Sequence, residues 1–268
     1  MKYRVGFIGA GNMGGALLRA AAKSLPAKKI AVCEADSELL ERLTREYGCA
    51  GVDLQSVCTD CDMIFLGVKP QVMPKVCAEM SGILWNRSEP FTLVSMAAGT
   101  SIQKVKEYIG FDVPIIRIMP NTPAAVGEGM ILYAPSENVP DDCVSDFIGM
   151  MSRAGRFDRI DERLIDAASA VSGCGPAFVY MFIEALADGG VACGLKRAKA
   201  LSYAAQTVIG AAKTVMETGA HPGLLKDSVC SPGGTTIAGV RELEEHGFRA
   251  SAMDAVIAAY EKTLELGK

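Results

Sequence analysis

Short apolar runs alternate with amphipathic stretches along the first 160 residues of this 268-residue chain. The runs have the length of buried strands, and they lie at 4–8, 30–33, 63–68, 91–96 and 113–119. The stretches between them have helical spacing, and they lie at 12–22, 37–47, 71–80 and 101–108. Strands that alternate with helices predict a parallel sheet with right-handed crossovers. Two weaker runs, at 130–133 and 156–160, are expected to complete it.

After residue 160 only helical stretches remain, and the main ones are expected at 175–192, 196–217, 235–245 and 249–266. We therefore predict an α/β domain over 1–160 and an all-α domain over 161–268. The stretch 201–215 contains one Lys and otherwise small, apolar or neutral residues. A helix that is apolar on nearly all sides must be covered, and a domain of this size has little room to cover two. We expect dimerisation through the helical domain, with a compact monomeric bundle as the alternative.

The composition narrows the possible partners and location. A net charge of −4 offers no basic surface for nucleic acid. The nine cysteines are odd in number and several lie in apolar runs, which indicates buried, reduced thiols in a cytoplasmic protein. Cys58 and Cys61 have CxxC spacing without a second pair, so we expect no metal. The longest apolar stretch, at 177–183, is too short to cross a membrane.

A glycine-rich turn follows the first predicted strand. Gly9, Gly11 and Gly14 fit the GxGxxG pattern, and a predicted helix begins within it. Such a helix start offers free amides and a positive dipole end to the phosphates of a dinucleotide. Glu34 lies 20 residues after Gly14, where an acid binds the ribose hydroxyls and repels a 2′-phosphate. On this chemistry alone we expect NADH rather than NADPH. The alternative is that Glu34 is a solvated loop carboxylate. Ser37 is the expected N-cap of the next helix, and Asp36 is the alternative.

Three further segments indicate ligand binding. VKPQ (68–71) and MPNTP (119–123) follow predicted strands, and ligands of open α/β sheets bind at the carboxyl ends of strands. SPGGTT (231–236) precedes a predicted helix, so its glycines and hydroxyls could hold a carboxylate. An ordinary capped turn is an equally good interpretation of that last segment taken alone.

Seven motifs together resemble the pyrroline-5-carboxylate reductase family along nearly the whole chain. They are FIGAGNM (7–13), VKPQ (68–71), MAAG (96–99), MPNTP (119–123), SGCGPA (172–177), ALADGG (185–190) and SPGGTT (231–236). The last three in combination are highly specific. The resemblance implies a Rossmann-type N-terminal domain, an all-α C-terminal dimerisation domain, and dimers that in this family often assemble into decamers.

The resemblance also implies the site residues and the cofactor, NADPH or NADH. Family habit favours NADPH, whereas Glu34 favours NADH. Cofactor contacts are implied for Ile8, Gly9, Ala10, Gly11, Asn12, Met13, Glu34, Val68, Lys69, Pro70, Met96, Ala97, Ala98 and Asn121. Substrate contacts are implied for Glu162, Ser231, Gly233, Gly234, Thr235 and Thr236.

The expected reaction is reduction of the C=N bond of 1-pyrroline-5-carboxylate to give L-proline. An imine nitrogen is readily protonated, so catalysis can rest on orientation of the two rings. Thr236 is the expected catalytic residue, through a hydrogen bond to that nitrogen, and a role as helix cap is the alternative. The chain has two histidines, and His221, next to Pro222, is expected at the surface or as a helix cap.

Two other functions fit parts of the pattern. A β-hydroxyacid dehydrogenase would need a catalytic Lys in the helical domain soon after a glycine-rich segment, but the first Lys after Gly175 is Lys196. A non-catalytic nucleotide sensor or scaffold would be favoured by loss of Thr236 or of the double glycine, and both are present.

Overall fold

The computed structural model describes residues 2–266, which divide into two compact units. The first runs to Cys174 and takes in the C-terminal residues from Ala259 onward, and the second is Gly175–Ala258. The strands end at Arg159, near the predicted boundary. The first unit nevertheless continues past this point because Ile165 is fully buried beside the sheet residues Met119, Leu132 and Ala134.

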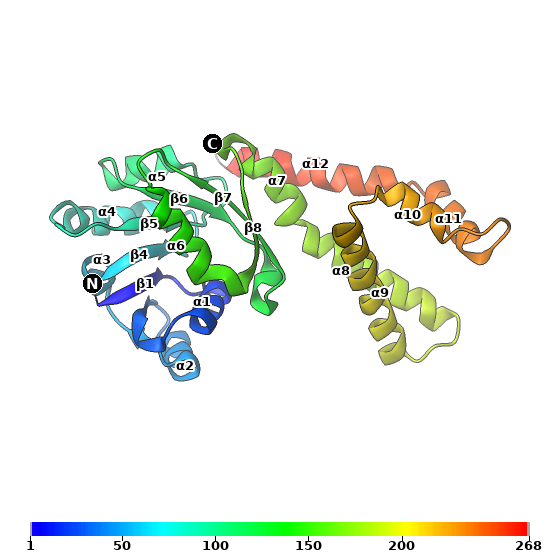
Figure 1. The fold of residues 1–268 in the computed structure, drawn as a ribbon, viewed down its shortest axis with the longest axis horizontal. Coiled ribbons are helices and arrows are strands. Elements are labelled where there is room, and N and C mark those ends of the chain that lie inside the picture. Colours follow the sequence, from blue (N-terminus) through cyan, green and yellow to red (C-terminus); the bar gives the residue numbers. More distant parts are fainter. Residues whose placement is uncertain (1, 267–268) are drawn as a thin grey trace. The chain divides into compact units, whose positions relative to one another are not determined.

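Within residues 2–266, eight strands form one sheet in the order β3-β2-β1-β4-β5-β6-β7-β8 (Figure 1). The strands are β1 Tyr3–Ile8, β2 Ile30–Cys33, β3 Ala50–Gly51, β4 Cys61–Leu66, β5 Thr92–Ser95, β6 Ile115–Met119, β7 Gly129–Pro135 and β8 Gly155–Arg159. The helices of this unit are α1 Asn12–Ser24, α2 Ser37–Tyr47, α3 Leu54–Asp60, α4 Met73–Trp85, α5 Ile102–Ile109, α6 Asp141–Met151 and α7 Ile165–Ser172. All seven predicted strands are confirmed, while β3, α3, α6 and α7 were not predicted as separate elements.

The expectation of a wholly parallel sheet is wrong at one place. β7 runs antiparallel to β6, with Ile118 opposite Tyr133. The cause is the short connection between them, a single 3₁₀ turn at Thr122–Val126 followed by Gly127. A parallel crossover needs a dozen or more residues, so this link can only return the chain alongside the strand it has just left.

Helices cover both faces of the sheet, and the alternation of side chains along each strand builds two cores (Figure 1). In β4, Met63 and Phe65 point into the core beneath α1, α2 and α6, whereas Ile64 and Leu66 point into the core beneath α3, α4 and α5. Phe65 stacks on Phe7 with ring centroids 4.7 Å apart. The continuous apolar runs in the sequence reflect this burial on both faces.

Three helix starts in this unit, those of α2, α3 and α5, are capped by side chains. Ser101 accepts a hydrogen bond from the Lys104 amide at 3.1 Å, which confirms it as the N-cap of α5. The N-cap of α2 is Asp36 and not Ser37, because the Asp36 carboxylate accepts from the Leu39 amide at 3.1 Å. The helix predicted at 71–80 begins at Met73, with Pro74 in its first turn.

The second unit is helical throughout. Its helices are α8 Gly175–Ala192, α9 Arg197–Thr218, α10 Pro222–Ser228, α11 Thr235–Glu245 and the first part of α12, Phe248–Leu266. α10 was not predicted. Within Gly175–Ala258, all of it described, the buried residues are Ala187, Ala200 and Ala204. Larger apolar side chains such as Met181 and Met216 are exposed.

One helical stretch, Glu162–Ala192, is long and apolar enough to cross a membrane by length and composition. The expectation that no apolar segment reaches this length is therefore wrong. The uninterrupted apolar run is short, but weakly polar and small residues on both sides extend the apolar helix.

The nine cysteines are all unpaired. Burial raises the pKa of the Cys58 and Cys61 thiols to about 12, so both remain protonated at neutral pH. Cys193 is exposed, contrary to the expectation of burial. Among residues 2–266 no group of three or more His, Cys, Asp or Glu side chains could hold a metal ion.

Candidate active site

The glycine turn joins β1 to α1 by close backbone packing. Gly9 has φ of +83°, which favours glycine, and its amide donates to the Cys33 carbonyl at 2.9 Å. A Cβ atom on Gly14 would lie 2.5 Å from the Gly9 carbonyl oxygen, and one on Gly9 would lie 3.0 Å from the backbone of Gly67. The sequence needs glycine at both positions because the first turn of α1 lies against the ends of β1 and β4.

The N-terminus of α1 is open. Its N-cap is Gly11, so no side chain accepts from the first amides of the helix. A Cβ atom on Gly11 would meet no protein atom within 4 Å. The first amides of a helix lack intrahelical acceptors, which leaves those of Asn12 and Met13 as donors at the positive end of the dipole. This arrangement fits the pyrophosphate of a dinucleotide.

Glu34 meets the glycine turn directly. Its Oε2 accepts from the Ala10 amide at 2.7 Å, and its Oε1 accepts from the amides of Ala35 and Asp36 at 2.8 and 3.2 Å. These contacts place the Glu34 side chain against the glycine turn. The carboxylate also holds the end of β2 against the loop that precedes α1.

The other predicted cofactor residues follow the carboxyl ends of neighbouring strands. Val68, Lys69 and Pro70 come after β4, and the Gly67 amide before them donates to the Ile8 carbonyl at 2.8 Å. Met96, Ala97 and Ala98 follow β5, the next strand in the sheet. These segments therefore lie along the same edge as the glycine turn.

Asn121, after β6, has a structural role that its sequence context did not reveal. Its Nδ2 donates to the Ser172 carbonyl at 2.8 Å, and its Oδ1 accepts from the Met130 amide at 2.9 Å. The side chain is buried. It ties β7 and α7 to the end of β6, so both of its polar ends already have backbone partners.

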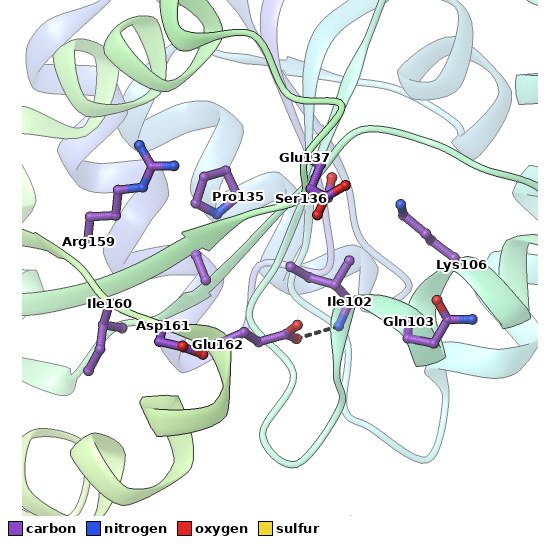
Figure 2. A pocket seen from close by; sticks show the side chains of 11 residues that line it. Ile102, Gln103, Lys106, Pro135, Ser136, Glu137, Arg159, Ile160, Asp161 and Glu162 are labelled. Atoms are coloured by element: carbon purple, nitrogen blue, oxygen red, sulfur yellow. Dashed lines mark hydrogen bonds between the residues drawn. The ribbon is translucent and has the colours of Figure 1, made fainter.

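Glu162 belongs to a charged network around a buried arginine. Its Oε1 accepts from the Ile102 amide at 2.6 Å (Figure 2) and lies 3.4 Å from Arg117 Nη1. Arg117 is 3% exposed and also pairs with Asp166 at 2.6 Å. An arginine inside an apolar strand was the available signal for this network, but its partners, 45 and 49 residues further along the chain, could not be inferred from spacing.

A pocket of about 560 Å³ lies beside Glu162, and Figure 2 shows the side chains that line it. Its lining comes from the start of α5, the end of β7 and the end of β8, including Lys106, Ser136 and Arg159. Lys106 pairs with Asp112 at 2.5 Å. The structure thus places Glu162 on the wall of a pocket of mixed charge within the first unit.

The predicted substrate loop of the second unit also leads into an open helix. The Gly234 amide donates to the Ser231 carbonyl at 3.0 Å, and Gly233 has φ of +66°. Gly234 is the N-cap of α11 and no side chain caps this helix, so Thr235 and Thr236 occupy its first two positions. Both threonines are exposed. The alternative that Thr236 caps α11 is therefore wrong.

The two histidines have structural partners. His221 Nδ1 accepts from the Gly223 amide at 3.1 Å and caps α10, which confirms the predicted role. His246 Nδ1 lies 2.8 Å from the Glu242 carbonyl oxygen. Both side chains are exposed, and neither belongs to the glycine turn or to the loop before α11.

Comparison with known families divides the chain in a similar place. Residues 162–266 match the family described as pyrroline-5-carboxylate reductase dimerisation, and residues 4–99 match NADP oxidoreductase coenzyme F420-dependent. The first of these matches covers the exposed apolar helices of the second unit and all of the long stretch Glu162–Ala192. Those surfaces thus belong to a segment that serves oligomerisation in the matched family.

Full-length relatives agree with these matches. The pyrroline-5-carboxylate reductases of Escherichia coli and Arabidopsis thaliana are both 43% identical, covering 100% and 99% of this chain and 100% and 96% of theirs. The crystal structure of a Plasmodium falciparum pyrroline carboxylate reductase with NADP bound has a TM-score of 0.89 at 32% identity, covering 99% of this chain and 98% of that one. With such relatives along its whole length, this chain belongs to the pyrroline-5-carboxylate reductase family.

Proposed function

We propose that this chain reduces 1-pyrroline-5-carboxylate to L-proline with NADPH or NADH, the last step of proline biosynthesis. It is then an oxidoreductase that acts on a C=N bond. The observation that carries the proposal is the 43% identity to a reductase of that name over the full length of both chains. The open, glycine-capped start of α1 supplies the matching place for a dinucleotide.

Residues along one edge of the sheet would hold the cofactor. The amides at the start of α1 would hold the pyrophosphate and Glu34 would hold the adenosine ribose. The segments after β4 and β5 would contact the nicotinamide half. The bound cofactor supplies a hydride to the imine carbon. The chain's own contribution is to fix the two rings at reacting distance, which is a large part of the rate gain in such reactions.

The loop before α11 would hold the substrate. Amides of Gly233 and Thr235 are the expected donors to its carboxylate, because a glycine-capped helix start attracts anions. Gly234 is expected to shape this contact, since its own amide donates to the Ser231 carbonyl. The Thr236 hydroxyl would form a hydrogen bond with the ring nitrogen of the substrate. Ser231 and Glu162 are further proposed contacts, with Glu162 acting through the oxygen that Ile102 and Arg117 leave free.

We propose a homodimer built through the helical domain, residues 161–268, with a decamer as the larger assembly found in the family. The exposed apolar side chains of α8 to α12 support this, since they need a cover that one copy does not provide. The cytoplasm is the proposed location, because the nine unpaired cysteines suit a reducing compartment. Neither nucleic acid nor a membrane is a proposed partner.

A steady-state assay tests the activity. Purified protein is given 1-pyrroline-5-carboxylate with NADPH and with NADH in parallel, and oxidation of the cofactor is followed together with formation of proline. We expect turnover with at least one cofactor. Turnover at background with both would leave a nucleotide-binding protein without this activity.

A further inference from the structure

Two helices begin at neighbouring strand ends on the cofactor edge of the sheet. They differ in whether their first amides are free to bind an anion. α1 follows β1 and α2 follows β2, and these strands are parallel neighbours with Ile8 opposite Cys33. The start of α1 has a glycine cap and no side-chain acceptor. The start of α2 is closed, because the Asp36 carboxylate accepts from the Leu39 amide. Only the first is left for a ligand phosphate.

A second carboxylate fills the space between the two helix starts. Glu34 accepts from three amides, one in the glycine turn at Ala10 and two in the turn that leads to α2, at Ala35 and Asp36. Successive backbone amides that point at one anion form a nest suited to phosphate or carboxylate. Here the anion in the nest is a side chain of the protein.

The adenosine ribose of a dinucleotide lies at the end of the second strand in this fold, where Glu34 stands. We propose that Glu34, with Asp36 beside it, occupies from within the position that a 2′-phosphate would need, and so makes this reductase prefer NADH. This inference rests on the proposed function. A carboxylate has about four acceptor sites on its two oxygens. The amides of Ala10, Ala35 and Asp36 take three of those of Glu34, so Oε2 can still accept one hydrogen bond from a ribose hydroxyl.

The surrounding charges point the same way. Residues 34–41 carry four acids and no base. The next basic residue is Arg42 in the second turn of α2, which lines a groove of about 320 Å³ with Gly11, Asn12 and Arg19. Arg19 is held by Tyr47 at 3.0 Å and lies 3.8 Å from Glu46. A phosphate of nearly two negative charges would meet two fixed carboxylates before it met either arginine.

The test compares the wild type, Glu34→Ser and Glu34→Gln with both cofactors. We expect the wild type to favour NADH by at least tenfold in kcat/KM. Glu34→Ser frees the nest and should shift the NADPH to NADH ratio by about tenfold toward NADPH, about 1.4 kcal/mol. Most of the shift should lie in KM for the cofactor, since the change is remote from the reacting carbon. Glu34→Gln removes the charge but keeps the bulk, and should fall between the two.

Fluorescence titration of each variant with NADH and NADPH, without substrate, gives a second measurement that does not depend on turnover. Glu38→Gln is the matched control, because it removes an exposed acid from the first turn of α2. It should change the ratio of the two Kd values by less than twofold. A wild type that prefers NADPH, or an unchanged ratio in a folded Glu34→Ser protein, would overturn the inference. If Glu34→Ser fails to fold, Glu34→Gln decides, with an unchanged ratio again counting against it. If no turnover is seen with either cofactor, the proposed function is wrong. The ratio of the Kd values for NADH and NADPH would still test the role of Glu34.

Discussion

The two units of this chain differ in whether their large apolar side chains are buried or exposed. In the nucleotide-binding unit, Phe7, Phe65 and Phe147 are fully buried and contact one another through their rings. In the helical unit, α8 and α9 meet through small residues, and a Cβ atom on Gly190 would lie 3.2 Å from that of Ala200. The large side chains of these helices point outward instead. The first unit completes its core alone, while the second keeps its apolar surface for a partner.

The same difference appears in the two glycine loops. The turn before α1 is packed against the sheet, with Gly9 and Gly14 fixed by backbone contacts. The loop before α11 is exposed, and a Cβ atom on Gly233 would meet nothing within 4 Å. Both leave a helix start without a side-chain cap. An open helix start is therefore the feature that the two proposed anion sites share, and the support around it differs.

Disruption of the proposed interface should have the largest effect. Met181, on α8, is 69% exposed in the single chain. If a second copy covers it, Met181→Asp buries an unpaired carboxylate at a cost of about 3 kcal/mol or more. We expect loss of the dimer in light scattering and a lower Tm. Trp85 on α4 is also 69% exposed, and Trp85→Asp should leave the mass unchanged. An unaltered mass for Met181→Asp would mean that this face of α8 lies outside the interface.

Regular elements with strong local signals could be predicted from the sequence. β1, β2 and β4 are continuous apolar runs because helices cover both faces of the sheet. α6 was missed although its start signal was present, with Pro140 as N-cap and two acids in the first turn. β3 has two residues, Ala50 and Gly51, too few for any periodicity.

The site could be predicted only where spacing alone brings residues together. Glu34 reaches Ala10 because a strand, a helix and a second strand return the chain to the same edge. The contacts of Arg117 with Glu162 and Asp166 depend on how α7 folds back over the sheet. That geometry is set by tertiary packing, so neither the partners of Arg117 nor those of Asn121 could be inferred.

Two glycines of the turn before α1 have different expected roles. Gly14 allows close packing, and Gly11 leaves room for the cofactor. Gly14→Ala should lower stability by about 2–3 kcal/mol, since its Cβ would lie 2.5 Å from a backbone oxygen that cannot move aside easily. Gly11→Ala meets no protein atom, so its Tm should stay near that of the wild type while cofactor Kd rises by about tenfold, roughly 1.4 kcal/mol. Thermal melts and cofactor titration of both variants measure this. Equal Tm losses would show that Gly11 is also needed for the fold.

The smallest expected change in stability is that of Thr236→Ala, and Ser101→Ala is the comparison. One replacement lies at a helix start without a side-chain cap and the other removes such a cap. Ser101 caps α5, so its replacement should lower stability by about 1 kcal/mol and leave kcat/KM nearly intact. Thr236 lies at the second position of α11, past its glycine cap, so its loss should barely change Tm. If its hydroxyl orients the imine nitrogen, kcat/KM should fall tenfold or more, on the order of 1.5–3 kcal/mol of transition-state stabilisation. Thr236→Ser keeps the hydroxyl and should recover most of the activity. An early-melting Thr236→Ala with native turnover would mean that the threonine supports the helix and leaves the chemistry to the glycine loop.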